Sequence, residues 1–224
     1  MRWLAAGTVL ALLLLPLLGC SSRDYTWRQK LTAIVNTPLG ERSGSSVSEF
    51  HGAVGYALDL GRTGNSGVIG EAVVIDLGND KYVFVLLDED INSLAWSVFE
   101  DELPKNGKTE IIWGALENFA GRTKVIPQKL YPRIVMFNDV KNPRTIVEVK
   151  PEAFSTILGR GYSLKSLLIT ITKEPVTDGR LAALIPWATK LTGSIAYADE
   201  RLLYNNILMQ VNNESFLRGH QNVK

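Results

Sequence analysis

The sequence has very few of the side chains that bind transition metals or form disulfides. Its 224 residues include one cysteine, Cys20, and two histidines, His51 and His220. One cysteine excludes an intramolecular disulfide, and no H-x-x-x-H pair or cysteine pair offers the nitrogen and sulfur ligands of a zinc site. We therefore expect no metal and no cofactor.

The chain also lacks an excess of charge of either sign. It has 24 basic and 23 acidic side chains, which gives a formal net charge of +1. Proteins that bind nucleic acids usually carry a marked basic excess, because they neutralise phosphates. A nucleic-acid partner is therefore not expected.

Long apolar runs are absent except at the N-terminus. There the uncharged run from Leu4 to Leu18 follows Arg2 and contains Gly7 and Pro16. A helix that spans a bilayer needs about 20 apolar residues, so this run is too short. A positive start, an apolar middle and a small residue at the end are typical of a secretory signal peptide.

Cys20 closes that run in the tetrad Leu17-Leu18-Gly19-Cys20. The tetrad resembles the lipobox of bacterial lipoproteins, although the position of Leu18 more often holds Ala, Ser or Thr. The resemblance implies cleavage before Cys20 and attachment of a diacylglycerol to its thiol. Acyl chains contribute ~0.8 kcal/mol per buried methylene and would hold the N-terminus in a bilayer. The alternative is an ordinary secretory signal with an incidental cysteine.

The residue after the cysteine bears on the location. Ser21 rather than Asp stands there, which resembles the outer-membrane sorting pattern of enterobacterial lipoproteins. The resemblance implies a lipid-anchored protein of the cell envelope, in the outer membrane and facing the periplasm. Only residues 21–25 separate Cys20 from the first strand-like residues, a tether of at most ~20 Å, so the folded part should lie near the membrane.

Four parts follow from these observations: a signal peptide at 1–19, the lipidated cysteine and tether at 20–25, a globular domain at 26–192, and a partly helical C-terminal extension at 193–224. Strands and helices in their order along the chain predict a single-domain α+β fold. We expect a largely antiparallel sheet of hairpins with helices packed on one face.

Alternating apolar and polar residues predict the strands. A turn at Pro38-Leu39-Gly40 and another at Gly78-Asn79-Asp80 should each close a hairpin. The segment from Tyr82 to Leu87 is apolar without alternation, which predicts a central strand covered on both faces. The strands are expected at 26–37, 43–54, 71–77, 81–87, 133–138, 145–150 and 164–174.

Helical spacing of apolar residues predicts the helices. Asp90 is expected to cap the first of them, and Gly121 and Gly159 to end two others. We predict a polar tail at 212–224. The helices are expected at 91–103, 110–120, 151–159, 178–185 and 199–211.

Some short stretches resemble those of a group of uncharacterised proteobacterial proteins: Trp27-Arg28-Gln29-Lys30-Leu31-Thr32 followed by Ser43-Gly44-Ser45-Ser46-Val47, and Asn138-Asp139-Val140-Lys141-Asn142-Pro143 before a strand. The resemblance covers most of the chain after the signal and implies no activity.

Three stretches offer candidate chemistry, each with a structural alternative that we favour. Ser45, Ser46 and Ser48 precede His51 as a nucleophile and base would, but a strand edge of small polar residues explains them. Residues 61–67 are rich enough in glycine for a phosphate loop, but no Lys-Ser or Lys-Thr follows, so a flexible connection is favoured. Asp88-Glu89-Asp90 offers calcium ligands without the spacing of an EF-hand, and carboxylates at a helix N-terminus favour the helix dipole.

The sequence therefore predicts no catalytic, cofactor-binding or metal-binding residue, and Cys20 is the one predicted site of modification. We expect an envelope lipoprotein that acts as a binding or structural module. Its partners would be the bilayer, through acylated Cys20, and an unidentified envelope protein or polymer. The alternatives are an envelope hydrolase with an unrecognised site and a surface-exclusion lipoprotein that blocks a receptor.

A chain that begins at Ser21 should fold and stay soluble without reductant, metal or lipid, because it has no thiol and is long enough for a large core. Size-exclusion chromatography, circular dichroism and a cooperative urea transition would check this. Loss of the fold on chelation or on removal of detergent would contradict it.

Overall fold

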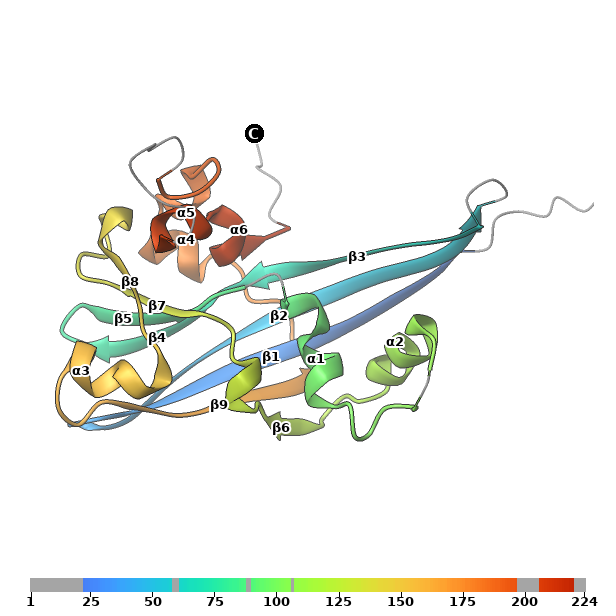
Figure 1. The fold of residues 1–224 in the computed structure, drawn as a ribbon, viewed down its shortest axis with the longest axis horizontal. Helices are drawn as coiled ribbons and strands as arrows, with labels where there is room; N and C mark the ends of the chain where they lie inside the picture. The colour runs from blue at the N-terminus through green and yellow to red at the C-terminus, as the bar shows by residue number, and fades with distance from the viewer. Residues whose placement is uncertain (1–21, 58–60, 88–89, 106, 197–205, 220–224) are drawn as a thin grey trace, which may run out of the picture.

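The computed structural model describes residues 22–57, 61–87, 90–105, 107–196 and 206–219. These residues form an α+β fold of antiparallel strands with short helices packed against them (Figure 1). The predicted fold class is confirmed. The strands divide into two sheets instead of one, because lateral pairing joins segments that lie far apart in the sequence.

The first sheet has six strands in the order β10-β3-β2-β1-β9-β6. Buried and more exposed side chains alternate along β1 from Tyr25 to Thr37, so the sheet has one apolar and one polar face. The predicted strand and the turn at Pro38-Leu39-Gly40 are confirmed. The strands are β1 (Arg23–Thr37), β2 (Gly40–Ala57), β3 (Gly61–Glu71), β6 (Thr123–Val125), β9 (Ser163–Thr172) and β10 (Leu217–Arg218).

Strands β1 to β3 extend together beyond the second sheet (Figure 1). We call this extension the arm; it consists of Arg23–Trp27, Phe50–Ala57 and Gly61–Val68, which are paired with one another. At ~3.3 Å per residue, β1 is about 50 Å long. Its first residue, Arg23, lies at the far end of the arm, and the turn at Pro38 and Leu39 lies at the opposite end of the molecule.

The second sheet has four strands in the order β4-β5-β7-β8, so β5 is an inner strand as predicted. Phe84 and Leu86 belong to one core cluster, and Val83, Val85 and Leu87 belong to the other. All five are buried, which confirms that this segment is covered on both faces. The strands are β4 (Val73–Gly78), β5 (Lys81–Val85), β7 (Ile134–Phe137) and β8 (Ile146–Glu148).

The predicted hairpin turn between β4 and β5 is also confirmed. Asn79 and Asp80 have φ angles of 53° and 58°, and the flanking residues Gly78 and Lys81 pair with each other. Positive φ at both central residues is the type I′ turn, which matches the twist of a two-residue hairpin.

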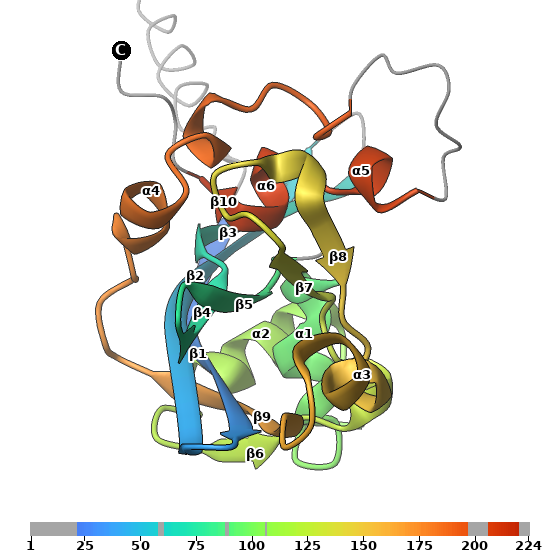
Figure 2. The same ribbon diagram turned by 90° about the vertical axis from the view of Figure 1, so that its left-hand side faces the viewer.

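Helices cover the second sheet from both sides (Figure 2). On one side α1 and α2 help to close the core between the two sheets, and on the other side α4, α6 and the residues around them close the second core. The helices are α1 (Ile91–Val98), α2 (Thr109–Glu117), α3 (Phe154–Leu158), α4 (Arg180–Leu184), α5 (Ile207–Gln210) and α6 (Asn213–Phe216). The 3₁₀ turns are η1 (Gln128–Leu130), η2 (Pro143–Thr145), η3 (Pro151–Ala153) and η4 (Ala188–Lys190).

The prediction that Asp90 caps a helix is wrong in its mechanism. Asp90 occupies the N-cap of α1 without a side-chain cap hydrogen bond, and its φ and ψ of −73° and −5° are helical. A capping side chain needs an extended backbone to reach the first-turn amides. The carbonyl of Asp90 accepts hydrogen bonds from Ser93 instead.

The flexible connection predicted at 61–67 is wrong, because these residues form the first part of β3 and pair with β2. The hydrogen bonds between strands involve only backbone groups. A glycine-rich segment can therefore form a strand when a long partner such as β2 lies beside it.

The polar tail predicted at 212–224 is wrong over its described part, 212–219. Phe216 is fully buried, and Leu217 pairs with Glu71 of β3. Val211 and Ile195 are buried in the same cluster, so the segment predicted as an extension supplies core residues. Part of the helix predicted at 199–211 lies outside the described residues, and α5 occupies its end.

The two sheets come together where β4 crosses β2. A Cβ atom on Gly44 of β2 would lie 1.9 Å from the carbonyl oxygen of Val74 in β4, so only glycine allows this approach. Close by, the buried carboxylate of Glu71 accepts hydrogen bonds from the amides of Gly179, at 2.6 Å, and Leu181, at 3.2 Å. Glu71 thereby joins the start of α4 to the junction between the sheets.

Phe84→Ala should lower the free energy of unfolding by about 3–5 kcal/mol, because it leaves a cavity in a closed core. Val85→Asp should cost more, since it buries an unpaired carboxylate. Leu39→Ala is the control, because this leucine is 81% exposed in a turn. Urea denaturation of the chain that begins at Ser21 would measure all three, and parent-like midpoints for Phe84→Ala and Val85→Asp would contradict the central placement of β5.

Candidate functional site

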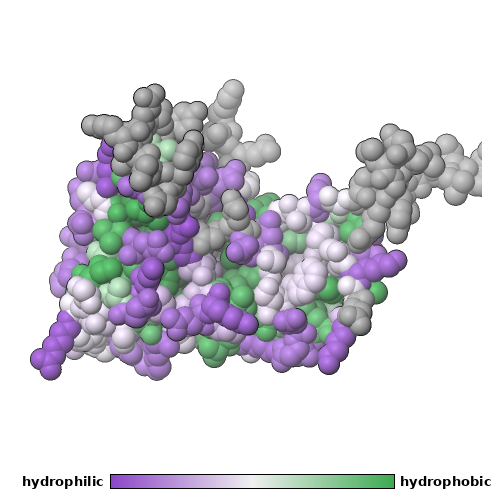
Figure 3. All heavy atoms as spheres, in the orientation of Figure 1, coloured by the Kyte–Doolittle hydropathy of each residue, from purple (hydrophilic) through white to green (hydrophobic). Residues whose placement is uncertain are grey.

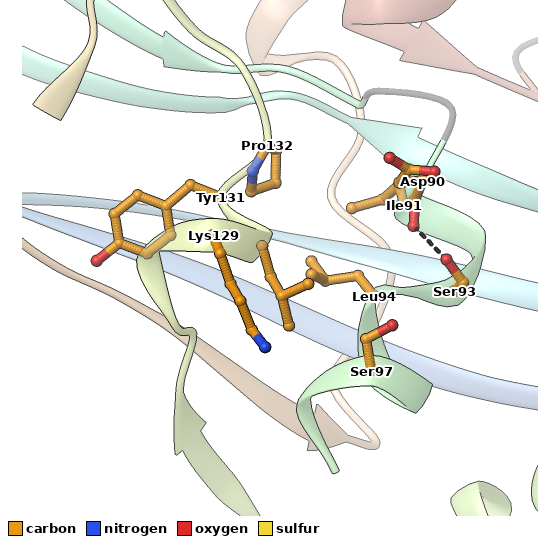
Figure 4. Close-up of a pocket in the computed structure, with 9 residues that line it drawn as sticks. Asp90, Ile91, Ser93, Leu94, Ser97, Lys129, Tyr131 and Pro132 are labelled. Atoms are coloured by element: carbon orange, nitrogen blue, oxygen red, sulfur yellow. Dashed lines mark hydrogen bonds between the residues drawn. The ribbon is translucent and has the colours of Figure 1, made fainter. Parts of the chain in front are cut away.

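A groove of about 230 Å³ lies between α1 and the segment that contains η1 (Figure 4). Its walls combine an apolar floor with polar groups at the rim. The lining residues are Asp90, Ile91, Ser93, Leu94, Ser97, Lys129, Leu130, Tyr131 and Pro132.

Local sequence rules explain how these side chains meet. Ser93 and Ser97 are four residues apart on α1 and therefore lie on the same side of the helix. Opposite them, the amide of Leu130 donates to the carbonyl of Pro127 and closes η1. This turn carries Lys129 toward the groove, whereas the ring of Tyr131 points away from it (Figure 4).

The groove presents two opposite charges across its apolar floor. Within the described part of the chain, neither the Lys129 ammonium nor the Asp90 carboxylate forms an ion pair or a side-chain hydrogen bond. Pockets for drug-sized molecules usually measure about 300–1,000 Å³. This groove therefore suits a small polar group, or one side chain of a larger partner.

A second, more polar hollow of about 440 Å³ adjoins the groove, since Asp90 lines both. It collects side chains from the segments that follow β5 and precede β7, from α5, α6 and Asn212 between them, and from β10. Its other lining residues are Leu87, Arg133, Gln210, Asn212, Glu214, Ser215 and Arg218. A polar surface thus runs from η1 to the C-terminal segment. Sequence patterns do not predict this surface, because its segments meet only through the fold.

The structure separates the residues of the possible serine nucleophile and histidine base. Ser46 and Ser48 are buried, and Ser46 donates to the carbonyl of Glu71 at 2.7 Å. Ser45 and His51 lie on the opposite face of β2, six residues and therefore about 20 Å apart. Nε2 of His51 lies 3.0 Å from Oε1 of Glu49. No serine of this stretch is within reach of His51.

Four of the other candidate residues lie outside the part of the chain that the structure describes: Cys20, Asp88, Glu89 and His220. Among the residues that are described, no three His, Cys, Asp or Glu side chains come together as a metal site would require.

The pKa shifts of the described groups belong to a surface ion cluster and not to the groove. Hydrogen bonds from Lys124 lower the pKa values of Asp101 and Glu102, and Arg122 lowers that of Glu102 further. The same contacts raise the pKa of Lys124, whose Nζ lies 2.8 Å from Oε1 of Glu102. This cluster ties the segment after α1 to β6, which is a structural role.

Comparison of the chain with protein families, curated proteins and solved structures found no match. In the described part, none of the helices has the length and apolar character needed to cross a membrane.

The ion cluster should stabilise the fold at neutral pH and not in acid. The folded-state pKa values of Asp101 and Glu102 lie below their ordinary values of 3.8 and 4.5. The stabilisation is therefore complete above about pH 5 and disappears as the pH falls through the folded-state values. Lys124→Gln should lower the urea midpoint at pH 7 and change it less at pH 3. Lys150→Gln, at an exposed site without a recorded ion pair, is the control; an equal effect of Lys124→Gln at both pH values would contradict the prediction.

Proposed function

We propose that the protein is a lipid-anchored lipoprotein of the bacterial cell envelope, held in the outer membrane, whose globular part is a binding or structural module in the periplasm. The observation that carries the proposal is the tetrad Leu17-Leu18-Gly19-Cys20. It follows an apolar run that is too short for a membrane span and has the order of a signal peptide.

The place where the fold begins supports such an anchor. β1 starts at Arg23, three residues after Cys20, at the far end of the arm (Figure 1). A lipid on Cys20 would therefore hold the molecule by one end of its long axis. The groove between α1 and η1 is set back from that end.

The groove is the surface that best fits a binding role. Its size and its opposite charges at Asp90 and Lys129 suit a polar group of an envelope protein or polymer. A nucleophile paired with a base would support the hydrolase alternative, and the separation of Ser45 from His51 removes the pairing that the sequence had offered.

Cys20→Ala should leave the protein as an uncleaved precursor or move it out of the detergent-rich phase, because the thiol that accepts the lipid is gone. Ser21→Ala is the matched control: it keeps the thiol and the apolar run, and should mature and partition like the parent. Triton X-114 partitioning with intact-mass analysis would measure both. A Cys20→Ala variant that matures and partitions like the parent would refute lipid anchoring.

A further inference from the structure

Helix α2 lies directly beside the first residues of β1. A Cβ atom on Gly114 would lie 4.0 Å from Nη2 of Arg23, and the amide of Thr26 donates to the carboxylate of Glu117 at 2.8 Å. The residues that follow Cys20 therefore enter the fold against α2.

Chain arithmetic places the outer side of α2 near the proposed lipid. Three residues from Cys20 to Arg23 span at most ~10 Å. Ile111 precedes Gly114 by three residues, which is about 4.5 Å along the helix. With the extended Arg23 side chain of ~7 Å and its 4.0 Å approach to Gly114 added, Ile111 lies within about 26 Å of the residue that would carry the acyl chains.

The beginning of α2 presents exposed apolar and basic side chains together, and the acidic residue of its first turn, Glu110, is half-buried. Ile111 is 50% exposed, and its amide donates to the carbonyl of Lys108. Lys105 and Lys108 are exposed and have no recorded ion pair with a described residue. We call Lys105, Lys108 and Ile111 the α2 patch; Figure 3 shows hydrophobic residues reaching the surface beneath the arm, among hydrophilic ones.

Neighbouring groups add to this character. Helix α1 contacts α2 and carries Trp96, which is 38% exposed. The nearby carboxylates of Asp101 and Glu102 are engaged by Lys124 and Arg122. Exposed aliphatic and lysine side chains together are typical of protein elements that rest in a lipid headgroup layer.

The opposite face of the arm is a poor match for lipid. The hollow there, of about 450 Å³, is lined by Asp24, Thr26, His51, Asn65 and their neighbours, without an exposed large apolar side chain. Anionic headgroups attract lysines and repel carboxylates. Of the two faces at the anchored end, the α2 side is the one that complements a membrane.

We propose that the α2 patch rests on the surface of the anionic bilayer in which Cys20 is anchored, so that the α2 side of the arm faces the lipid. This inference depends on the lipid anchor proposed above. The short tether brings the patch to the headgroups, and its lysines and isoleucine hold that side against them.

Single-cysteine labelling tests this orientation, because acylation of Cys20 leaves an introduced cysteine as the one free thiol. Full-length, lipidated Ile111→Cys and Leu39→Cys proteins would each carry an environment-sensitive fluorophore. They would be reconstituted in vesicles of phosphatidylethanolamine and phosphatidylglycerol that contain a nitroxide-labelled lipid. The nitroxide should quench the label at 111 several-fold more than the label at 39, which sits in the turn at the opposite end of β1. Lys108→Glu in the Ile111→Cys protein should reduce that quenching.

The outcomes separate the two proposals. Equal quenching at 111 and 39 in a protein that stays bound to vesicles would overturn the orientation and leave the lipid anchor standing. A protein that does not stay with the vesicles would overturn the anchor, and the orientation with it. Strong quenching at 111 that Lys108→Glu leaves unchanged would overturn the role of the lysines.

Discussion

The buried carboxylate of Glu71 is the contact that joins the two halves of this fold. It stands where the chain leaves the first sheet for the second, and it accepts the amides of Gly179 and Leu181. An ionised group in a dry interior is tolerated when hydrogen-bond donors surround it, and losing those donors costs several kcal/mol. The segment that covers Phe84 and Phe137 is therefore held in place by a polar contact as well as by apolar packing.

What the sequence predicted well were features with a local period. Alternation along β1, the unbroken apolar run of β5 and the end of α3 at Gly159 each depend on neighbours in the chain. The end predicted at Gly121 is wrong, because α2 already ends at Glu117 with Asn118 as its C-cap. The role of Glu71 was hidden, because the amides that it binds lie 108 and 110 residues away. Residues 61–67 misled for a related reason: their side chains carry no strand pattern, and the partner strand β2 alone makes them a strand.

The candidate functional residues show the same contrast between features set by neighbours in the chain and features set by distant contacts. The lipid anchor at Cys20 is proposed from the sequence alone, because such an anchor is specified by a short contiguous pattern. The groove was not, since Lys129 and Asp90 belong to separate segments whose meeting depends on how α1 and η1 pack. The serines before His51 show the opposite case. They are close to the histidine in sequence, which suggested a site, but successive side chains of a strand point to opposite faces, so Ser46 and Ser48 lie on the other face from His51.

The late position of Phe216 and Leu217 has a consequence for how this protein is made. One face of the second sheet is covered by residues that are synthesised before the C-terminal segment. Its other face, and the pairing of β10 with β3, both require the C-terminal segment. Contacts between such distant parts of a chain form slowly and only once both are present. A nascent or truncated chain that ends before α6 would lack the ring of Phe216, which packs against Phe84 and Phe137, and exposed apolar surface of this kind makes incomplete chains prone to aggregation. The apolar face around Phe84 is therefore fully covered only after the segment around Phe216 has docked on it.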